Sequence, residues 1–188
     1  MGVFFTSDQH FGHANIIAYS GRPFRDADHM SAELVERHNA VVSDADEVWH
    51  LGDFSLDERL VARILPRLRG RHHLVAGNHD ACHSSHHRGA SRVRRYLDAG
   101  FLDVQESFEL ELPTLGLVDL CHMPYVGDHT DRDRYVDHRP VDRGRWLLHG
   151  HVHEQWKRRD RMINVGVDQW DYAPVEVERL VAFAREQA

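Results

Sequence analysis

Short apolar segments alternate with amphipathic segments along the chain, a pattern typical of an α/β protein. Strands are predicted where brief apolar runs are bounded by turn residues, over 3–6, 48–51, 73–76, 145–148 and 162–167. Helices are predicted where apolar residues recur at helical spacing, over 30–42, 60–65, 93–97 and 176–186. Asp26 or Asp28 is available to cap the first helix, and Pro66 ends or kinks the second.

After Gly100 the apolar period changes to two, which predicts a hairpin of 108–112 and 117–121 around a turn at 113–116.

The chain has 188 residues without an internal repeat or a Gly/Ser-rich linker, so we expect one domain over residues 1–188. We expect neither a membrane span nor a secretory signal, because the apolar runs are too short. Two separated cysteines suit a reducing compartment, so a cytoplasmic location is predicted.

The charge and the histidine content narrow the classes of function. A net charge of -7 excludes a polycation that binds nucleic acid by charge alone. The chain also contains 17 histidines, far above ordinary usage. Because imidazole is the commonest metal ligand in proteins, this composition indicates a metal-binding protein.

Polar side chains follow five of the predicted strands, at the point where each strand ends. They are Asp8, His10, Asp53, Asn78, His122, His151 and His153. Open α/β sheets build their sites at the carboxyl ends of their strands, so we expect these residues to meet. Glycines within most of these clusters allow the backbone to turn sharply beside a ligand.

These seven side chains offer only oxygen and imidazole nitrogen as donors, which suit Mn, Fe, Co or Zn better than Cu(I). Seven ligands are too many for one tetrahedral ion. They suit two divalent ions that share one carboxylate and a bridging hydroxide nucleophile. We expect Mn first, with Fe, Ni, Co or Zn as alternatives.

Five short motifs carry this pattern: D-x-H at 8–10, G-D at 52–53, G-N-H-D at 77–80, the lone His122 and G-H-x-H at 150–153. In this order they resemble the calcineurin-like metallophosphoesterases, a family with two metal ions. The opening segment 8–24 is similar to a compact bacterial and phage branch of predicted phosphoesterases. Val152 departs from the small hydroxyl residue frequent in relatives, but its side chain is not a ligand. The resemblance implies a four-layer α/β/β/α sandwich, in the α/β class.

The resemblance also implies a role for each motif residue. The first metal ion would be held by Asp8, His10 and His153. The second would be held by Asn78, His122 and His151, with Asp53 bridging the two. His79 matches the family's catalytic histidine, which acts as general acid on the leaving oxygen or stabilises charge on the phosphoryl group, and Asp80 would orient it.

For the residues around the motifs, the sequence allows both a functional role and a structural one. His13 would touch substrate or serve in a loop or cap, and Arg22 would bind a phosphate or form a structural ion pair. The histidines of 83–87 would receive a phosphate-rich substrate or lie on a solvated helix face. Segment 126–143 is charged and aperiodic, typical of a mobile surface loop or of a lid. Trp156 would pack in the core or stack on a base.

We therefore predict a metal-dependent phosphoester hydrolase. A phosphodiesterase is favoured, because basic residues cluster after the third and fifth motifs and would hold a second phosphate or a nucleic-acid end. The alternative enzyme is a phosphomonoesterase for nucleotides or small phosphates, and the alternative of another class is a metal-binding scaffold without turnover. Neither a membrane nor an obligate protein partner is expected.

Overall fold

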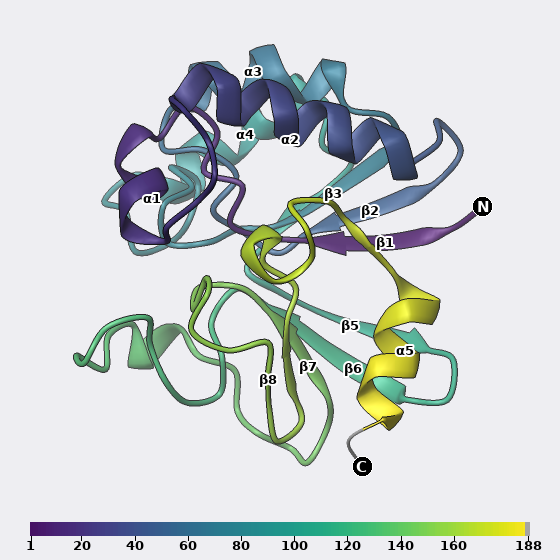
Figure 1. Ribbon diagram of the computed structural model, residues 1–188. Coiled ribbons are helices and arrows are strands. Elements are labelled where there is room, and N and C mark those ends of the chain that lie inside the picture. The colour runs from purple at the N-terminus through teal and green to yellow at the C-terminus, as the bar shows by residue number, and fades with distance from the viewer. Residues whose placement is uncertain (187–188) are drawn as a thin grey trace.

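Two five-stranded sheets stack face to face in the computed structural model, which describes residues 1–186 (Figure 1). The first sheet contains β10 (Val175–Glu176), β1 (Val3–Thr6), β2 (Glu47–His50), β3 (Arg71–Val75) and β4 (Val104–Gln105), in that order. The second contains β5 (Ser107–Leu112), β6 (Gly116–Cys121), β7 (Leu147–His149), β9 (Met162–Asn164) and β8 (Arg158–Arg159). Strands β1 to β4 are parallel, and so are β6, β7 and β9, so each sheet has a parallel core.

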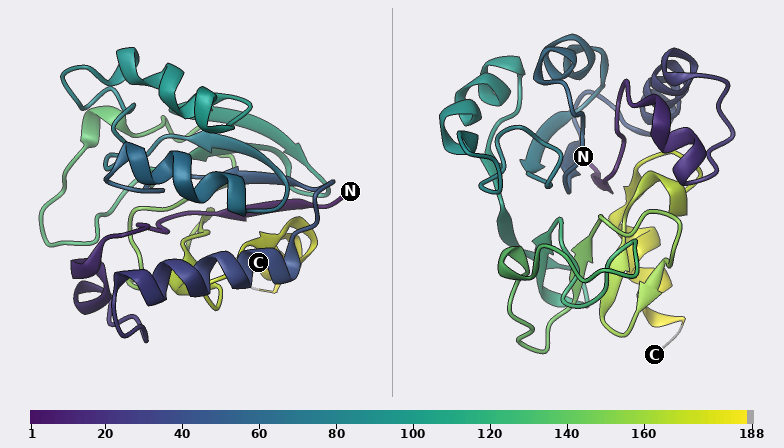
Figure 2. Two further views of the ribbon diagram at one scale, coloured as in Figure 1. Left: turned by 90° about the horizontal axis from the view of Figure 1, so that it is seen from above. Right: turned by 90° about the vertical axis from the view of Figure 1, so that its left-hand side faces the viewer.

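Helices cover the outer face of the first sheet. The helices of the chain are α1 (Ala14–Tyr19), α2 (Ala27–Val41), α3 (Glu58–Ile64), α4 (Gly89–Ala99) and α5 (Val177–Arg185). Three single-turn 3₁₀ helices are also present, η1 (Leu65–Arg67), η2 (Val136–His138) and η3 (Val167–Gln169). Figure 2 shows α2, α3 and α4 side by side above the first sheet, with α5 on the other side of it. Among residues 1–186, no helix has the length and apolar character that a membrane crossing needs.

Two apolar clusters hold these layers together. One lies between the sheets, where Phe5 and Trp49 of the first sheet meet Leu120 and Leu148 of the second, and α5 adds Leu180. The other lies between the first sheet and helices α2, α3 and α4. Burial of apolar surface at these two interfaces is the main stabilising contribution.

The outer face of the second sheet is covered by the chain that follows β6. Cys121, Leu147 and Met162 point to this side and pack against Met123 and Tyr135. The fourth layer is therefore a covering segment that contains only η2. The predicted α/β class, with two stacked sheets in one domain, is confirmed.

Most predicted elements are present, and the differences have local causes. Asp26 caps α2 by accepting a hydrogen bond from His29 N at 2.7 Å, and α3 ends before Pro66, which lies in η1. The predicted strand 162–167 ends at Asn164, whose side chain accepts a hydrogen bond from Gly166 N and so turns the chain. The elements not predicted are α1, β4, β8, β10 and the three 3₁₀ helices. Each is too short to show a period of hydrophobicity.

Candidate metal centre

The loops after five strands bring the seven predicted ligands to one end of the sandwich. Asp8 and His10 follow β1, Asp53 follows β2, and Asn78 follows β3. From the second sheet, His122 follows β6, and His151 and His153 follow β7. All seven side chains are buried. This end carries α1 and segment 126–143 and lies opposite the N-terminus in Figure 1.

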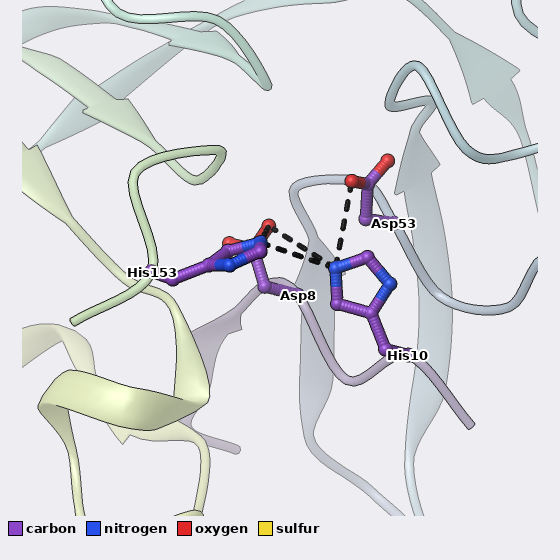
Figure 3. A group of neighbouring side chains, drawn as sticks. All are labelled: Asp8, His10, Asp53 and His153. Carbon is purple, nitrogen blue, oxygen red and sulfur yellow. Dashed lines mark hydrogen bonds and ion pairs between the residues drawn. The ribbon is translucent and has the colours of Figure 1, made fainter. Parts of the chain in front are cut away.

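Four of these residues form one tight group (Figure 3). Nε2 of His10 lies 3.2 Å from Nε2 of His153 and 3.6 Å from Oδ2 of Asp53. Nε2 of His153 lies 3.4 Å from Oδ1 of Asp8. Two imidazole nitrogens and two carboxylates thus converge on one point, which is the arrangement that a divalent cation requires.

The other ligands adjoin this group through Asp53. Its Oδ2, which faces His10, lies 3.4 Å from Nε2 of His122. The ring of His122 is 5.4 Å from that of His151, and Nδ1 of His151 lies 3.1 Å from Oδ1 of Asn78. A single oxygen of Asp53 therefore faces histidines of both predicted ligand sets.

Hydrogen bonds to the backbone connect the two sheets at this centre. Both carboxylate oxygens of Asp8 accept hydrogen bonds from His151 N at 3.1 Å. Nδ1 of His122 lies 2.8 Å from the carbonyl oxygen of Leu51, at the end of β2. That contact turns Nε2 of His122 toward the centre, as a second partner commonly does for metal-binding histidines.

Five ligands adopt a backbone conformation that residues with a side chain rarely occupy. Positive φ angles of 57°, 51°, 55°, 72° and 45° occur at Asp8, His10, Asp53, His151 and His153. Such conformations cost of order 1–3 kcal/mol each and persist where the surrounding structure holds them. Strain is thus concentrated at this centre, as is common at functional sites.

Glycines in the motifs make room for the ligands. A Cβ atom at Gly77 would collide with Oδ1 of Asp53, and one at Gly150 would collide with Oγ of Ser7. Any side chain at either position would displace a loop that carries a ligand.

The buried nitrogens at the centre fit a bound metal. Nε2 of His122 and Nε2 of His151 are buried, and neither has a hydrogen-bond partner in the described structure. Burial lowers the pKa of His122, but the Asp53 carboxylate outweighs burial and raises that pKa to about 9. A positive charge at the position of His122 is therefore stabilised by Asp53. Burial, followed by the charge of His122, lowers the pKa of His151 to about 3 and leaves its imidazole neutral, the form that binds metals.

The structure contradicts the role predicted for Asp80. Its Oδ2 accepts hydrogen bonds from Asp53 N and Gly77 N at 2.8 and 2.9 Å, and its Oδ1 accepts one from Phe54 N at 3.0 Å. The carboxylate is fully buried under these loops and has no hydrogen bond to the ring of His79 in the described residues. Asp80 therefore positions the loop of Asp53 and does not orient His79.

Arg22 is also engaged within the fold. Its Nε and Nη2 donate to Asp168 at 2.8 and 2.7 Å, and its Nη2 and Nη1 donate to the carbonyls of Asp8 and Gln9 at 2.7 and 3.1 Å. The residue is 4% exposed. The structural ion pair accounts for Arg22. The predicted substrate contact is wrong, because Asp168 and the carbonyls of Asp8 and Gln9 accept the hydrogen bonds that the guanidinium donates.

His13 and His79 both lie beside His10. Their rings are 5.6 and 5.4 Å from the ring of His10, and both side chains are half-buried. His79 N donates to Oδ1 of Asp53 at 2.8 Å, so the histidine is held against the centre by its own backbone. Both imidazoles are therefore near enough to act on a substrate bound at the metal ligands.

Segment 126–143 contributes two side chains that the sequence reasoning did not single out. Oδ2 of Asp128 lies 3.5 Å from Nε2 of His151, and Arg134 holds the Asp128 carboxylate at 2.8 Å. The ring of His129 stacks on that of His153 with centroids 5.1 Å apart. The segment thus lies against the centre, as a lid would. No motif marks Asp128 or His129, and the only signal was their place in an aperiodic segment after His122.

Two of the basic residues after the fifth motif bind backbone carbonyls of the protein. Nζ of Lys157 donates to the carbonyl of Gln169 at 2.6 Å, and Arg158 donates to the carbonyl of Ala184 at 3.0 Å. Trp156 packs against His149, with ring centroids 4.8 Å apart. These contacts occupy Lys157 and Arg158 within the fold, and the ring contact favours the packing role for Trp156.

Comparison with known proteins assigns the chain to a family. Residues 1–175 match the calcineurin-like phosphoesterase superfamily domain. The chain is 38% identical to the gene 66 protein of Mycobacterium phage D29, over 94% of each chain. It is 28% identical to an uncharacterized protein of Methanocaldococcus jannaschii, over 95% of this chain and 89% of the relative. The crystal structure of a protein of unknown function from Aquifex aeolicus superposes with a TM-score of 0.71 at 26% identity, over 97% of this chain and 98% of that one.

Proposed function

The chain belongs to the calcineurin-like phosphoesterase superfamily, whose members are metal-dependent phosphoester hydrolases, and we propose that it cleaves phosphodiesters with two divalent metal ions. The observation that carries this proposal is the convergence of Asp8, His10, Asp53 and His153 with their ligand atoms within 4.8 Å of one another. A buried group of this composition has no purpose in packing, because two buried carboxylates placed together repel each other and their charge is costly to bury. A bound cation removes that penalty.

We assign the ligands to two ions that share Asp53. One ion takes Asp8, His10 and His153, and the other takes Asn78, His122 and His151. The position of Asp53 Oδ2, 3.6 Å from His10 and 3.4 Å from His122, supports the shared carboxylate. The oxygen and nitrogen donors suit Mn first, and also Fe, Ni, Co or Zn. When bound, such ions lower the pKa of water and neutralise charge on the phosphate.

His79 is the proposed general acid. Its imidazole is half-buried beside His10, and its backbone N–H bond to Asp53 ties it to the shared ligand. A proton donated from this ring to the leaving oxygen would allow an alcohol to depart in place of an alkoxide. His13, whose ring lies 5.6 Å from that of His10, is proposed to contact the phosphate oxygens.

One pocket at the centre supports a diester as the substrate class. It has a volume of about 370 Å³ and is lined by Tyr19, His129 and the ligand His153. A second pocket, of about 850 Å³, is lined by His86 and Arg88 and contains none of the seven ligands; it adjoins the centre through His86, whose Nε2 lies 2.9 Å from the carbonyl oxygen of Asn78. We propose that the first pocket holds one organic group of a diester and that the second receives the other. A cytoplasmic location is proposed from the two buried free thiols of the chain.

The test compares hydrolysis of bis-p-nitrophenyl phosphate with that of p-nitrophenyl phosphate. Metal-stripped protein is resupplied with Mn, Fe, Ni, Co or Zn, and Asp53→Asn serves as the control for metal-independent turnover. We expect faster turnover of the diester. Faster turnover of the monoester would make the protein a phosphomonoesterase, and no turnover with two ions bound would make it a scaffold.

A further inference from the structure

A second group of metal-ligating side chains lies outside the centre described above. It consists of His83 from the loop after β3, Glu106 from the turn between β4 and β5, and His138 from η2. One ligand atom from each lies within 4.8 Å of the others. Nε2 of His83 is 3.7 Å from Oε2 of Glu106, and the rings of His83 and His138 are 4.9 Å apart.

We propose that His83, Glu106 and His138 bind one further divalent ion, of the zinc class. Two imidazoles and one carboxylate are a common protein ligand set for zinc, with water as the fourth ligand. Ligand atoms on a tetrahedral zinc ion lie roughly 3.4 Å apart, so only a small rotation of each side chain closes the site. Burial lowers the pKa of His83 to about 4, which keeps that imidazole neutral at pH 7.

Neighbouring contacts already hold two of the three ligands in place. The Glu106 carboxylate accepts hydrogen bonds from Ser84 N and Ser84 Oγ at 2.6 and 2.7 Å. Each carboxylate oxygen has a second lone pair that stays available for a metal. Nδ1 of His83 is paired with Ser85, at 2.8 Å from Oγ and 3.1 Å from the N–H, so its Nε2 points to Glu106. Surrounding groups thus orient the side chains of His83 and Glu106, as metal sites require.

The ion would attach segment 126–143 to the body of the protein. His138 belongs to this segment, whereas His83 and Glu106 belong to loops on the first sheet and beside it. The carbonyl of His138 also accepts a weak hydrogen bond from Sγ of Cys121, next to the ligand His122. Because the same segment carries Asp128 and His129 to the catalytic centre, zinc at this site would stabilise its closed position.

The first experiment counts the ions bound by wild type and by His138→Ala. Metal-stripped protein is saturated with zinc, freed of excess zinc, and measured by mass spectrometry of the elements. We expect His138→Ala to hold one ion fewer per chain than wild type. The matched control, His87→Ala, removes an exposed histidine of the loop that contains His83 and should hold as many ions as wild type. The difference between variants tests this site whatever number of ions the catalytic centre binds.

The second experiment measures trypsin cleavage within segment 126–143, which contains the exposed residues Arg132 and Arg143. We expect zinc to slow cleavage by the same factor in wild type and in His87→Ala, and by a smaller factor in His138→Ala, in which only zinc at the catalytic centre still acts on the segment. Glu106→Gln removes the anionic ligand, whose side chain is 41% exposed, and should also lose the ion. Equal zinc content in wild type and His138→Ala would overturn the proposal, as would cleavage of wild type that zinc does not alter.

Discussion

Replacement of Arg22 by methionine tests whether this residue stabilises the fold or binds substrate. The change removes the buried partner of Asp168, whose side chain is 1% exposed, and leaves the carbonyls of Asp8 and Gln9 without their donors. Removing one member of a buried ion pair costs about 3–5 kcal/mol, because the remaining charge stays buried and unpaired. For a chain of this size, such a loss lowers the melting temperature by roughly 6–20 °C.

The assay is urea unfolding of metal-free protein at pH 7, with Arg94→Met as the control. Arg94 is 80% exposed and pairs with Asp98 along α4, so its replacement should change the free energy of unfolding by at most about 0.5 kcal/mol. The double variant R22M/D168N should recover about 1–3 kcal/mol of the loss, since no charge is then left unpaired. An Arg22→Met protein with wild-type stability and a raised KM would refute the reasoning and restore the substrate role.

Three further predictions concern Asp53, His79 and His38. Asp53→Asn should lose both catalytic ions; retention of two ions on metal analysis would exclude a shared carboxylate. His79→Ala should keep its metals but lose roughly 10²–10⁴ in kcat, and a wild-type rate would remove it as the acid. His38, which is 4% exposed, has its pKa lowered to about 4 by burial. The unfolded chain therefore takes up a proton first as pH falls below about 6.5, and stability falls between about pH 6.5 and 4. Between pH 7 and pH 5 the protonation of His38 in the unfolded chain lowers the free energy of unfolding by about 2 kcal/mol. Urea unfolding should therefore show a smaller decrease of this free energy for His38→Gln than for wild type. An equal decrease in the two proteins would contradict the assignment.

The sequence determined which residues can carry the chemistry. Asp8, His10, Asp53 and His122 each follow a recognisable strand, and the carboxyl ends of parallel strands lie at one edge of a sheet. The periodicity of apolar residues predicted the longer helices and the core strands, because an element that buries one face repeats apolar residues along its own sequence. The two-residue strands β4, β8 and β10 have no period of their own, since their neighbours supply the hydrogen bonds that define them.

Tertiary structure alone decided what the polar residues near the motifs contact. Asp80 is next to His79 in sequence, yet its oxygens accept hydrogen bonds from the backbone of Asp53, Phe54 and Gly77. Arg22 is occupied by Asp168, 146 positions away. A side chain's type sets what it can bind, whereas its partner depends on which distant segments pack beside it. That dependence is also why Asp128 and His129 at the metal centre required the folded chain to be found.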